Sequence, residues 1–277
     1  MNLRIGYSPC PNDTFIFYAL THGLIPVDNH IITPIVEDVE TLNRKALEQH
    51  SLDVTKVSFH AFAHLRDHYA LLHAGAALGK GCGPIIISKK KLKPEELKES
   101  RIAIPGTYTT ANLLLRLYEP KIKKTVQMPF DQIMPAITKG EVDCGVIIHE
   151  ARFTYPDYGL REVVDLGEWW EEETGHLIPL GAIIAKRAYD RDFIHKIDHW
   201  LKESIEYALK RRREPMEYIR AHANEMDEET ICRHINLYVN KYTLEIGKEG
   251  TRSIKHLMEM GEEKGLIPYT EKPLFIE

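Results

Sequence analysis

Ser8-Pro9-Cys10-Pro11-Asn12-Asp13-Thr14-Phe15 separates a short apolar run at residues 3–7 from an apolar helical pattern at 15–21. The two prolines cannot continue a strand ladder, and a side-chain oxygen of residues 12–14 can cap the helix that follows. The octapeptide therefore predicts a strand, a rigid turn and a helix N-terminus. Because unpaired backbone N–H groups at such a terminus attract anions, the turn is either a plain capped connection or a binding site for a carboxylate or phosphate.

Strand and helix patterns alternate through the rest of the first half of the chain. Short apolar runs predict strands, and apolar residues at helical spacing predict a further helix. The predicted strands are 3–7, 30–35, 54–58, 69–74 and 84–88, and the predicted helices are 15–21 and 39–48. This alternation predicts an α/β fold.

A second α/β unit follows a glycine-rich stretch at 79–83 and a polar stretch at 89–100. Its predicted strands are 101–104, 124–128 and 142–148, and its predicted helices are 110–118 and 130–138. After a strand at 181–185 the pattern becomes helical, at 192–213, 215–223, 227–239 and 243–264. We therefore expect a larger lobe of residues 1–90 plus 185–277, a smaller inserted lobe of residues 91–184, and a ligand cleft between the two.

Composition excludes several classes of protein. The net charge of −5 argues against nucleic-acid binding, which normally needs a basic excess. The four cysteines form no C-x-x-C pair, so neither a zinc knuckle nor a disulfide framework is indicated. There is no export-signal pattern, and no apolar run approaches the ~20 residues that span a bilayer. We expect a cytoplasmic protein with no membrane or nucleic-acid partner; the sequence does not indicate its oligomeric state.

Polar residues at the ends of predicted strands are the candidate site residues. Ser58 ends one strand, where open α/β sheets bind ligands, although its hydroxyl can equally cap the next helix. Thr109 and Thr110 open a helix in the second unit and offer hydroxyls and backbone N–H groups. His149 ends the most apolar strand of that unit. It is either a general base, since histidine titrates near neutrality, or a residue that bonds a neighbouring backbone group.

His60, His64 and His68 follow one another at i, i+4 and i+8, a spacing that places three imidazoles on one face of a helix. This resembles part of a zinc site. No glutamate lies between the first two histidines, and no convincing further ligand is present. A polar helix face is the favoured interpretation, and we expect no metal.

Five further motifs accompany the octapeptide at 8–15. They are Val57-Ser58-Phe59-His60-Ala61, Gly79-Lys80-Gly81-Cys82-Gly83-Pro84, Ile104-Pro105-Gly106-Thr107-Tyr108-Thr109-Thr110-Ala111, Ile147-Ile148-His149-Glu150-Ala151-Arg152 and Asp165-Leu166-Gly167-Glu168-Trp169-Trp170. Together these motifs resemble the 1,4-dihydroxy-6-naphthoate synthases of the futalosine route to menaquinone. The similarity spans about residues 3 to 187, and the octapeptide is its most specific part.

The resemblance implies a two-lobed, periplasmic-binding-protein-like (type 2) fold used for catalysis. It implies a lyase that converts cyclic dehypoxanthine futalosine to 1,4-dihydroxy-6-naphthoate and dihydroxyacetone, without a metal or organic cofactor. In this family the proposed base corresponds to His149, and ligand-binding positions correspond to Ser58, Thr109 and Thr110.

Asn12 and Asp13 are further candidates for substrate binding, because the octapeptide would form one wall of the cleft. Two alternatives remain, a chorismate dehydratase of the same pathway and a non-catalytic protein that binds a small carboxylate. The octapeptide and His149 favour the synthase, and the lack of an export signal disfavours the binding protein. In each case the partner is a small carboxylated molecule.

Overall fold

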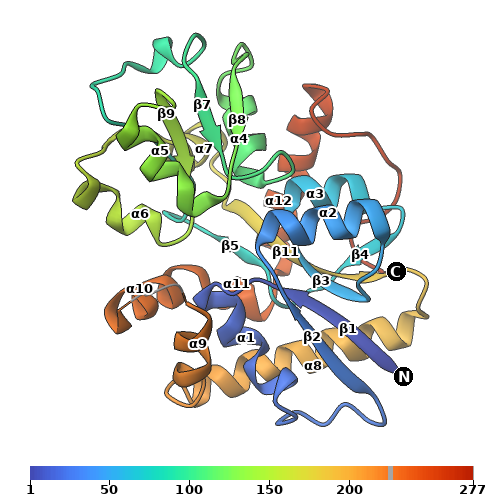
Figure 1. The fold of residues 1–277 in the computed structure, drawn as a ribbon. Helices are drawn as coiled ribbons and strands as arrows, with labels where there is room; N and C mark the ends of the chain where they lie inside the picture. The colour runs from blue at the N-terminus through green and yellow to red at the C-terminus, as the bar shows by residue number, and fades with distance from the viewer. Residues whose placement is uncertain (224–226, 277) are drawn as a thin grey trace.

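The computed structural model describes residues 1–223 and 227–276 and contains two β-sheets (Figure 1). The first sheet has the strand order β2-β1-β3-β11-β4, and β5 pairs with β11. β1 runs parallel to β2 and β3, whereas β11 is antiparallel to β3, β4 and β5. These strands are β1 (Asn2–Tyr7), β2 (Ile31–Val36), β3 (Val54–Ser58), β4 (Tyr69–Leu71), β5 (Ala77–Gly79) and β11 (Ile178–Lys186).

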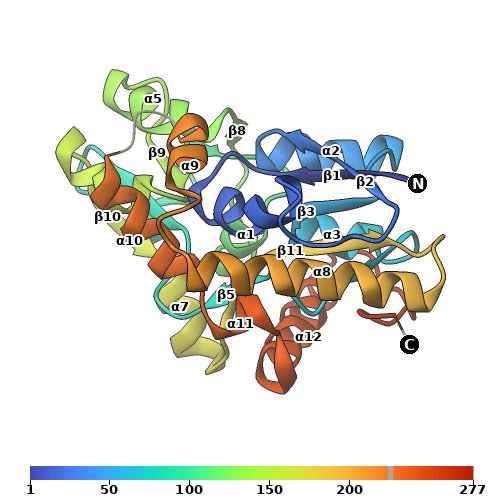
Figure 2. The ribbon, with the colours of Figure 1, turned by 90° about the horizontal axis from the view of Figure 1, so that it is seen from below.

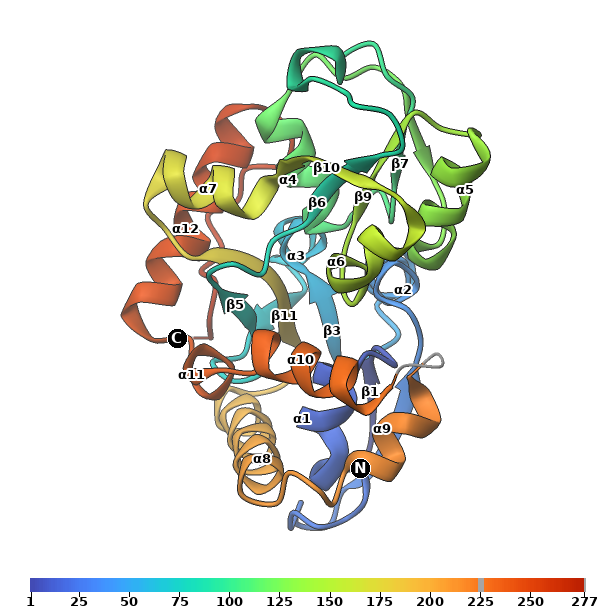
Figure 3. The same ribbon diagram turned by 90° about the vertical axis from the view of Figure 1, so that its left-hand side faces the viewer.

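The second sheet has the order β10-β6-β9-β7-β8. β7 is parallel to β8 and β9, and β6 is antiparallel to β9 and β10. The strands are β6 (Ile85–Ser88), β7 (Ile102–Ile104), β8 (Thr125–Gln127), β9 (Cys144–Ile147) and β10 (Arg161–Asp165). We call the first sheet with its helices the first lobe, and the second sheet with its helices the second lobe. Figure 3 shows the second lobe stacked on the first.

Helices cover both sheets. α8 packs along α1 on the underside of the first lobe, and α9 and α10 also contact α1 (Figure 2). In the first lobe these helices are α1 (Pro11–Thr21), α2 (Val39–Gln49), α3 (Phe59–Leu65), α8 (Arg191–Lys210), α9 (Met216–His222), α10 (Glu228–Tyr238) and α11 (Lys241–Leu244). In the second lobe they are α4 (Thr110–Tyr118), α5 (Ile133–Lys139), α6 (Ala151–Thr154) and α7 (Leu166–Thr174), together with short 3-10 turns at Pro94–Glu96, Phe130–Gln132 and Tyr155–Tyr158.

The two crossings between the sheets differ from the predicted lobe boundaries at 90/91 and 184/185. β6 belongs to the second sheet, so the glycine-rich stretch before it is itself the first crossing. β11 already joins the first sheet at Ile178, where its pairing with β5 shifts register between Pro179 and Gly181. Proline and glycine hide the start of this strand in the sequence, because both are rare in regular strands.

The octapeptide forms the predicted strand, turn and helix, but the predicted cap was wrong. α1 begins at Pro11, after Cys10 as the N-cap residue, and no side chain caps its backbone. Proline suits the first helical position because the N–H group that it lacks would be unpaired there in any case. Residues 12–14 lie inside the first turn, where the Thr14 hydroxyl bonds the Cys10 carbonyl at 3.0 Å and the side chains of Asn12 and Asp13 bond other groups.

α12 (Gly247–Glu263) connects the two lobes, whereas we expected the C-terminal helices to return to the first lobe alone. It contacts β11 of the first lobe and α4 of the second. Its buried Ile254, Leu257 and Met258 join a core that contains Val57 from one sheet and Val146 from the other. Figure 3 shows α12 beside both β11 and α7. Among the described residues, no helix is long and apolar enough to cross a membrane.

Candidate active site

A cavity lies between the two lobes. Apolar and polar residues from both sheets form its wall, so it suits a ring system that carries a few polar groups. Its lining residues are Ser8, Asn12, Asp13, Val39, Lys56, Ser58, Ala77, Cys82, Gly83, Pro84, Thr109, Thr110, Ala111, Ile148, His149, Leu180, Gly181 and Tyr238. The cavity thus brings together all six residues that the sequence nominated.

The carboxylate of Asp13 is the centre of the wall that the first lobe contributes. Its Oδ2 accepts hydrogen bonds from the backbone N–H (3.2 Å) and the hydroxyl (2.7 Å) of Ser8. Its Oδ1 accepts hydrogen bonds from Asn12 Nδ2 (2.8 Å) and Lys56 Nζ (2.7 Å). Four donors match the acceptor capacity of a carboxylate. Asp13 therefore organises this wall through its own neighbours.

Lys56 places a buried ammonium beside the cavity. It lies in the middle of β3, and the side-chain alternation of a strand puts it on the same face as Ser58. Gly181 of the adjacent β11 leaves room for its stem, since a Cβ there would come within 2.7 Å of Lys56 Cε. One ammonium proton bonds Asp13, which leaves two donors. Lys56 is the only lysine or arginine among the described residues that line the cavity.

Asn12 links Asp13 to a histidine that the sequence did not single out. Because Asn12 donates from Nδ2 to Asp13, its Oδ1 accepts the hydrogen bond from His234 Nε2 at 2.9 Å. His234 is fully buried on α10, and burial holds the pKa of its imidazole well below the usual range. His234 is therefore neutral and carries its proton on Nε2. This bond anchors α10 to the octapeptide.

His149 lies on the second-lobe side of the cavity, two residues after β9. Its backbone is left-handed, with φ of +59°, a conformation that non-glycine residues adopt rarely and that occurs often at functional sites. The imidazole contacts Cys10 Sγ at 3.6 Å and the ring of Phe130 at 5.2 Å between centroids. Burial lowers the pKa of His149 to about 4. The imidazole is consequently neutral at pH 7 and can accept a proton.

Thr109 and Thr110 lie on the wall that the second lobe contributes, but their hydroxyl protons are already used. Thr109 Oγ1 donates to the Gly106 carbonyl at 2.8 Å and accepts from Asn112 N at 3.3 Å, which caps α4. Thr110 Oγ1 donates across the lobes to the Leu180 carbonyl at 2.6 Å. Across residues 1–223 and 227–276, the backbone N–H groups of Thr110 and Ala111 have no acceptor. These N–H groups are the free donors of this wall.

Ser58 keeps its hydroxyl available to the cavity. It precedes α3 as the N-cap residue, yet its side chain makes no capping hydrogen bond, so the capping alternative was wrong. Its backbone N–H donates to Asn43 Oδ1 at 2.9 Å, and its Oγ accepts from Asn43 Nδ2 at 3.2 Å. The Ser58 hydroxyl proton is therefore free to donate to a bound molecule.

The three histidines of the possible zinc site do not share one helix. α3 ends at Leu65, so His68 lies beyond it. His60 is buried, and its Nδ1 lies 3.2 Å from the Thr109 carbonyl of the other lobe. Within the part of the chain that the structure describes, no group of three or more His, Cys, Asp or Glu residues is arranged to hold a metal ion.

Ser8, Lys56 and Tyr238 are polar lining residues that the sequence did not nominate individually. Lys56 carried a signal, because a lysine in the centre of an otherwise buried strand needs an anionic partner. Tyr238 ends α10, and the hydroxyl of this buried residue has no hydrogen-bond partner among the described residues. Burial raises the pKa of Tyr238, so the phenol stays protonated. No sequence pattern distinguished it from an ordinary core tyrosine.

Comparison with known proteins identifies the family. A family model described as menaquinone biosynthesis matches residues 3–263. The chain belongs to this menaquinone-biosynthesis family. Within that family it is 48% identical over 276 residues to a 1,4-dihydroxy-6-naphthoate synthase of Thermus thermophilus, with 99% of each chain covered. It is 40% identical to the synthase of the same name from Streptomyces coelicolor, over 96% of this chain and 95% of that protein.

Solved structures extend the comparison to the fold. A crystal structure from Archaeoglobus fulgidus has a TM-score of 0.90 and 40% identity over 96% of this chain and 98% of its own. An alkanesulfonate-binding protein of Xanthomonas axonopodis has a TM-score of 0.72 at 18% identity, with 97% and 94% covered. A Candida albicans protein described as having the generic periplasmic-binding-protein fold has a TM-score of 0.67 at 11% identity, with 98% and 92% covered. The predicted two-lobed, periplasmic-binding-protein-like fold is confirmed.

Proposed function

We propose that this protein is a 1,4-dihydroxy-6-naphthoate synthase that splits cyclic dehypoxanthine futalosine into 1,4-dihydroxy-6-naphthoate and dihydroxyacetone. The observation that carries the proposal is the placement of His149. A neutral imidazole on a strained backbone lies against the interlobe cavity and contacts Cys10 of the octapeptide that is most specific to the family. The activity named for relatives with 48% and 40% identity supports the same reaction.

In the proposed reaction His149 takes one proton from the substrate. The electron pair left behind drives cleavage of a carbon–carbon bond, the naphthalene ring becomes aromatic, and the three-carbon fragment receives a proton as it leaves. Substrate and products contain the same atoms, so no oxidant, reductant or other co-reactant is needed. The protein supplies a base and fixes the geometry, as expected of a lyase that works without a cofactor.

Two positive features of the cavity have separate roles in this proposal. The free N–H groups of Thr110 and Ala111 at the N-terminus of α4 bind the ring carboxylate. Burial lowers the pKa of His149, the Asp13 carboxylate raises it and the charge of Lys56 lowers it. Lys56 also stabilises the negative charge that develops near the base. Ser58 and Tyr238 provide further hydroxyls for the oxygens of the substrate. Leu180, Ala77 and Pro84 among others exclude water from the rings.

We also propose that the protein acts in the cytoplasm. All four cysteines are free, which agrees with a reducing cytoplasm as the site of action.

The deciding experiment incubates the purified protein separately with cyclic dehypoxanthine futalosine and with chorismate, and measures product formation by liquid chromatography. We expect 1,4-dihydroxy-6-naphthoate from the first and no change in the second, with the same rate after dialysis against a chelator. Turnover of chorismate alone would show a dehydratase, and binding without turnover of either compound would show a binding protein. Loss of activity on chelation would contradict cofactor independence.

A further inference from the structure

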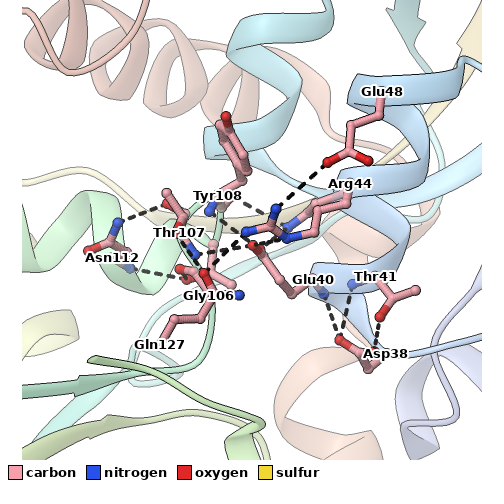
Figure 4. A network of polar contacts seen from close by, with 12 residues as sticks. Asp38, Glu40, Thr41, Arg44, Glu48, Gly106, Thr107, Tyr108, Asn112 and Gln127 are labelled. Carbon is pink, nitrogen blue, oxygen red and sulfur yellow. Dashed lines mark hydrogen bonds and ion pairs between the residues drawn. The ribbon is translucent and has the colours of Figure 1, made fainter. Parts of the chain in front are cut away.

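Glu40 of the first lobe bonds directly to the backbone of the second lobe. It lies in the first turn of α2 and is buried. Its Oε1 accepts a hydrogen bond from the Thr107 N–H at 3.2 Å, and its Oε2 accepts one from the Tyr108 N–H at 3.3 Å (Figure 4). We call Glu40, Thr107 and Tyr108 the interlobe clasp. One carboxylate thus holds two consecutive amides of the turn between β7 and α4.

The residues around the clasp support the same contact. Arg44 bonds Glu40 at 3.2 Å and also donates to Gln127 Oε1, which lies at the end of β8 in the second lobe. Asn43 Nδ2 approaches both Glu40 Oε2 and the Tyr108 carbonyl at 3.4 Å, and reaches Ser58 Oγ at 3.2 Å. Figure 4 shows Arg44 and Glu40 pointing toward the turn at residues 106–108. The clasp is therefore connected to the cavity wall through Asn43.

Gly106 permits this close approach. A Cβ on Gly106 would lie 2.4 Å from Glu40 Oε2 and 2.5 Å from Glu40 Cδ. Any larger residue would push the carboxylate away from the turn. The contact therefore requires the Glu40 carboxylate in the first lobe and a residue without a side chain, Gly106, in the second.

The clasp directly precedes the free donors of the second-lobe wall. Thr107 and Tyr108 directly precede Thr109, the N-cap residue of α4, and the free N–H groups of Thr110 and Ala111. When the lobes separate, the hydrogen bonds between Glu40 and the two amides break, and these groups bond water instead. The clasp therefore stabilises the closed arrangement of the lobes and not the open one. A contact that forms in only one of two states shifts the equilibrium toward that state.

We propose that Glu40 is a positioning residue that closes the clasp when the lobes meet and thereby sets the N-terminus of α4 for the substrate. This rests on the proposed function, because it names the device that positions the substrate in that reaction. A hydrogen bond to a charged group contributes more than one between neutral groups. We expect Glu40→Ala to raise KM by about tenfold or more, because the hydrogen bonds that it removes stabilise only the closed complex with substrate. kcat should fall by less.

The controls separate positioning from general stability. Glu48 is a second carboxylate on the same helix; it contacts the same Arg44 at 3.7 Å but is exposed. Glu48→Ala should therefore leave KM unchanged. Glu40→Gln keeps one carbonyl oxygen and should fall between wild type and Glu40→Ala. Gly106→Ala displaces the carboxylate without removing its charge and should also raise KM. If Glu40 served folding alone, the variant would lose apparent kcat in proportion to its unfolded fraction, with KM unchanged, and the proposal would be wrong.

Amide hydrogen exchange makes the test independent of turnover. We expect a peptide covering residues 105–112 to exchange faster in Glu40→Ala than in wild type or Glu48→Ala, with and without 1,4-dihydroxy-6-naphthoate. Equal exchange in all three proteins would overturn the clasp. If wild type neither turns over the cyclic substrate nor binds 1,4-dihydroxy-6-naphthoate, the proposed function fails, and the exchange experiment still decides whether the clasp exists.

Discussion

Two turns that end in helix N-termini form opposite walls of the cavity, and they are held in different ways. The first-lobe turn around Asp13 is held by groups of its own lobe, since Ser8, Asn12 and Lys56 supply all the partners of its carboxylate. The second-lobe turn at residues 106–111 is held by Asn112 and Gln127 of its own lobe and, in addition, by groups of the other lobe. Its partners there are Glu40, Asn43, His60 and the Leu180 carbonyl.

Because of this difference, the two walls take their final shape at different stages. A wall whose polar groups bond within one lobe keeps its shape whether the lobes are open or closed. A wall whose polar groups bond across the cavity reaches its final shape only on closure. We infer that the first-lobe wall is preformed and that the second-lobe wall is completed by closure. The following expectations test this comparison, from the largest effect to the smallest.

His149 lies between the two walls, and replacing it tests the reaction that both walls are proposed to support. We expect His149→Asn to lower kcat by roughly 10²- to 10⁴-fold, the usual contribution of a general base. Asparagine also tolerates the left-handed backbone, so the fold should persist. Steady-state turnover measures the first effect, and calorimetric titration with 1,4-dihydroxy-6-naphthoate should give a Kd within about tenfold of wild type. His199→Asn, at an exposed position, is the control. More than a tenth of wild-type activity in His149→Asn would assign the base to another group.

Asp13→Asn should break the preformed wall. The change keeps the shape of the side chain but leaves the ammonium of Lys56 buried without its anionic partner, which costs about 3–5 kcal/mol. Urea unfolding followed by circular dichroism measures the loss. Adding Lys56→Met should restore much of the stability but not the activity, because the unpaired charge is removed along with its catalytic role. A loss below about 1 kcal/mol in Asp13→Asn would show that the ion pair does not organise this wall.

Thr110→Val should weaken the wall that closure completes. It removes the hydroxyl that bonds the Leu180 carbonyl across the lobes, a contact that contributes about 1 kcal/mol. We expect KM to rise about fivefold with little change in kcat, and Thr110→Ser to restore the wild-type value. If the urea midpoint of the ligand-free protein falls as far as in Asp13→Asn, the two walls do not differ in the way described.

The smallest expected effect near neutrality is the change of kcat/KM with pH. Because burial lowers the pKa of His149 to about 4, kcat/KM should stay constant from pH 8 to about pH 5 and decrease as pH falls through 4. Stability should change earlier. His60 and His149 bind protons near pH 6.5 when unfolded but only near pH 4 when folded, so the free energy of unfolding should decrease as pH falls from about 6.5 to 4. An inflection of kcat/KM near 6.5 would show a hydrated His149 and an open resting cavity.

Local patterns predicted much of the fold and part of the site. Strand β3 was predicted with its observed bounds, and α2 to within one residue, because apolar spacing and turn residues act over short distances. The six nominated residues all lie on the cavity, since each follows a strand or opens a helix. The sequence could not predict that Thr110 uses its hydroxyl within the protein, because the acceptor, the Leu180 carbonyl, lies 70 residues away.

Contacts between distant segments account for the rest. Lys56 bonds Asp13 across 43 residues, and His234 bonds Asn12 across 222 residues. α12 connects the lobes through apolar residues that look like those of any amphipathic helix. A single sequence indicates that such residues are buried but does not identify their partners. The octapeptide thus lies on the cavity, as the sequence indicated, whereas its ion pair and the interlobe clasp required the structure.

The left-handed backbone at His149 has a consequence for the evolution of this chain. Glycine adopts that conformation without penalty and asparagine with little, so histidine is not the residue that the local backbone favours. A library of variants ranked by cellular abundance and the same library ranked by menaquinone-dependent growth would then order the residues at position 149 differently. Selection for a robust scaffold alone would tend to remove the imidazole, whereas selection for the reaction would keep it there under the proposed role of His149 as the base.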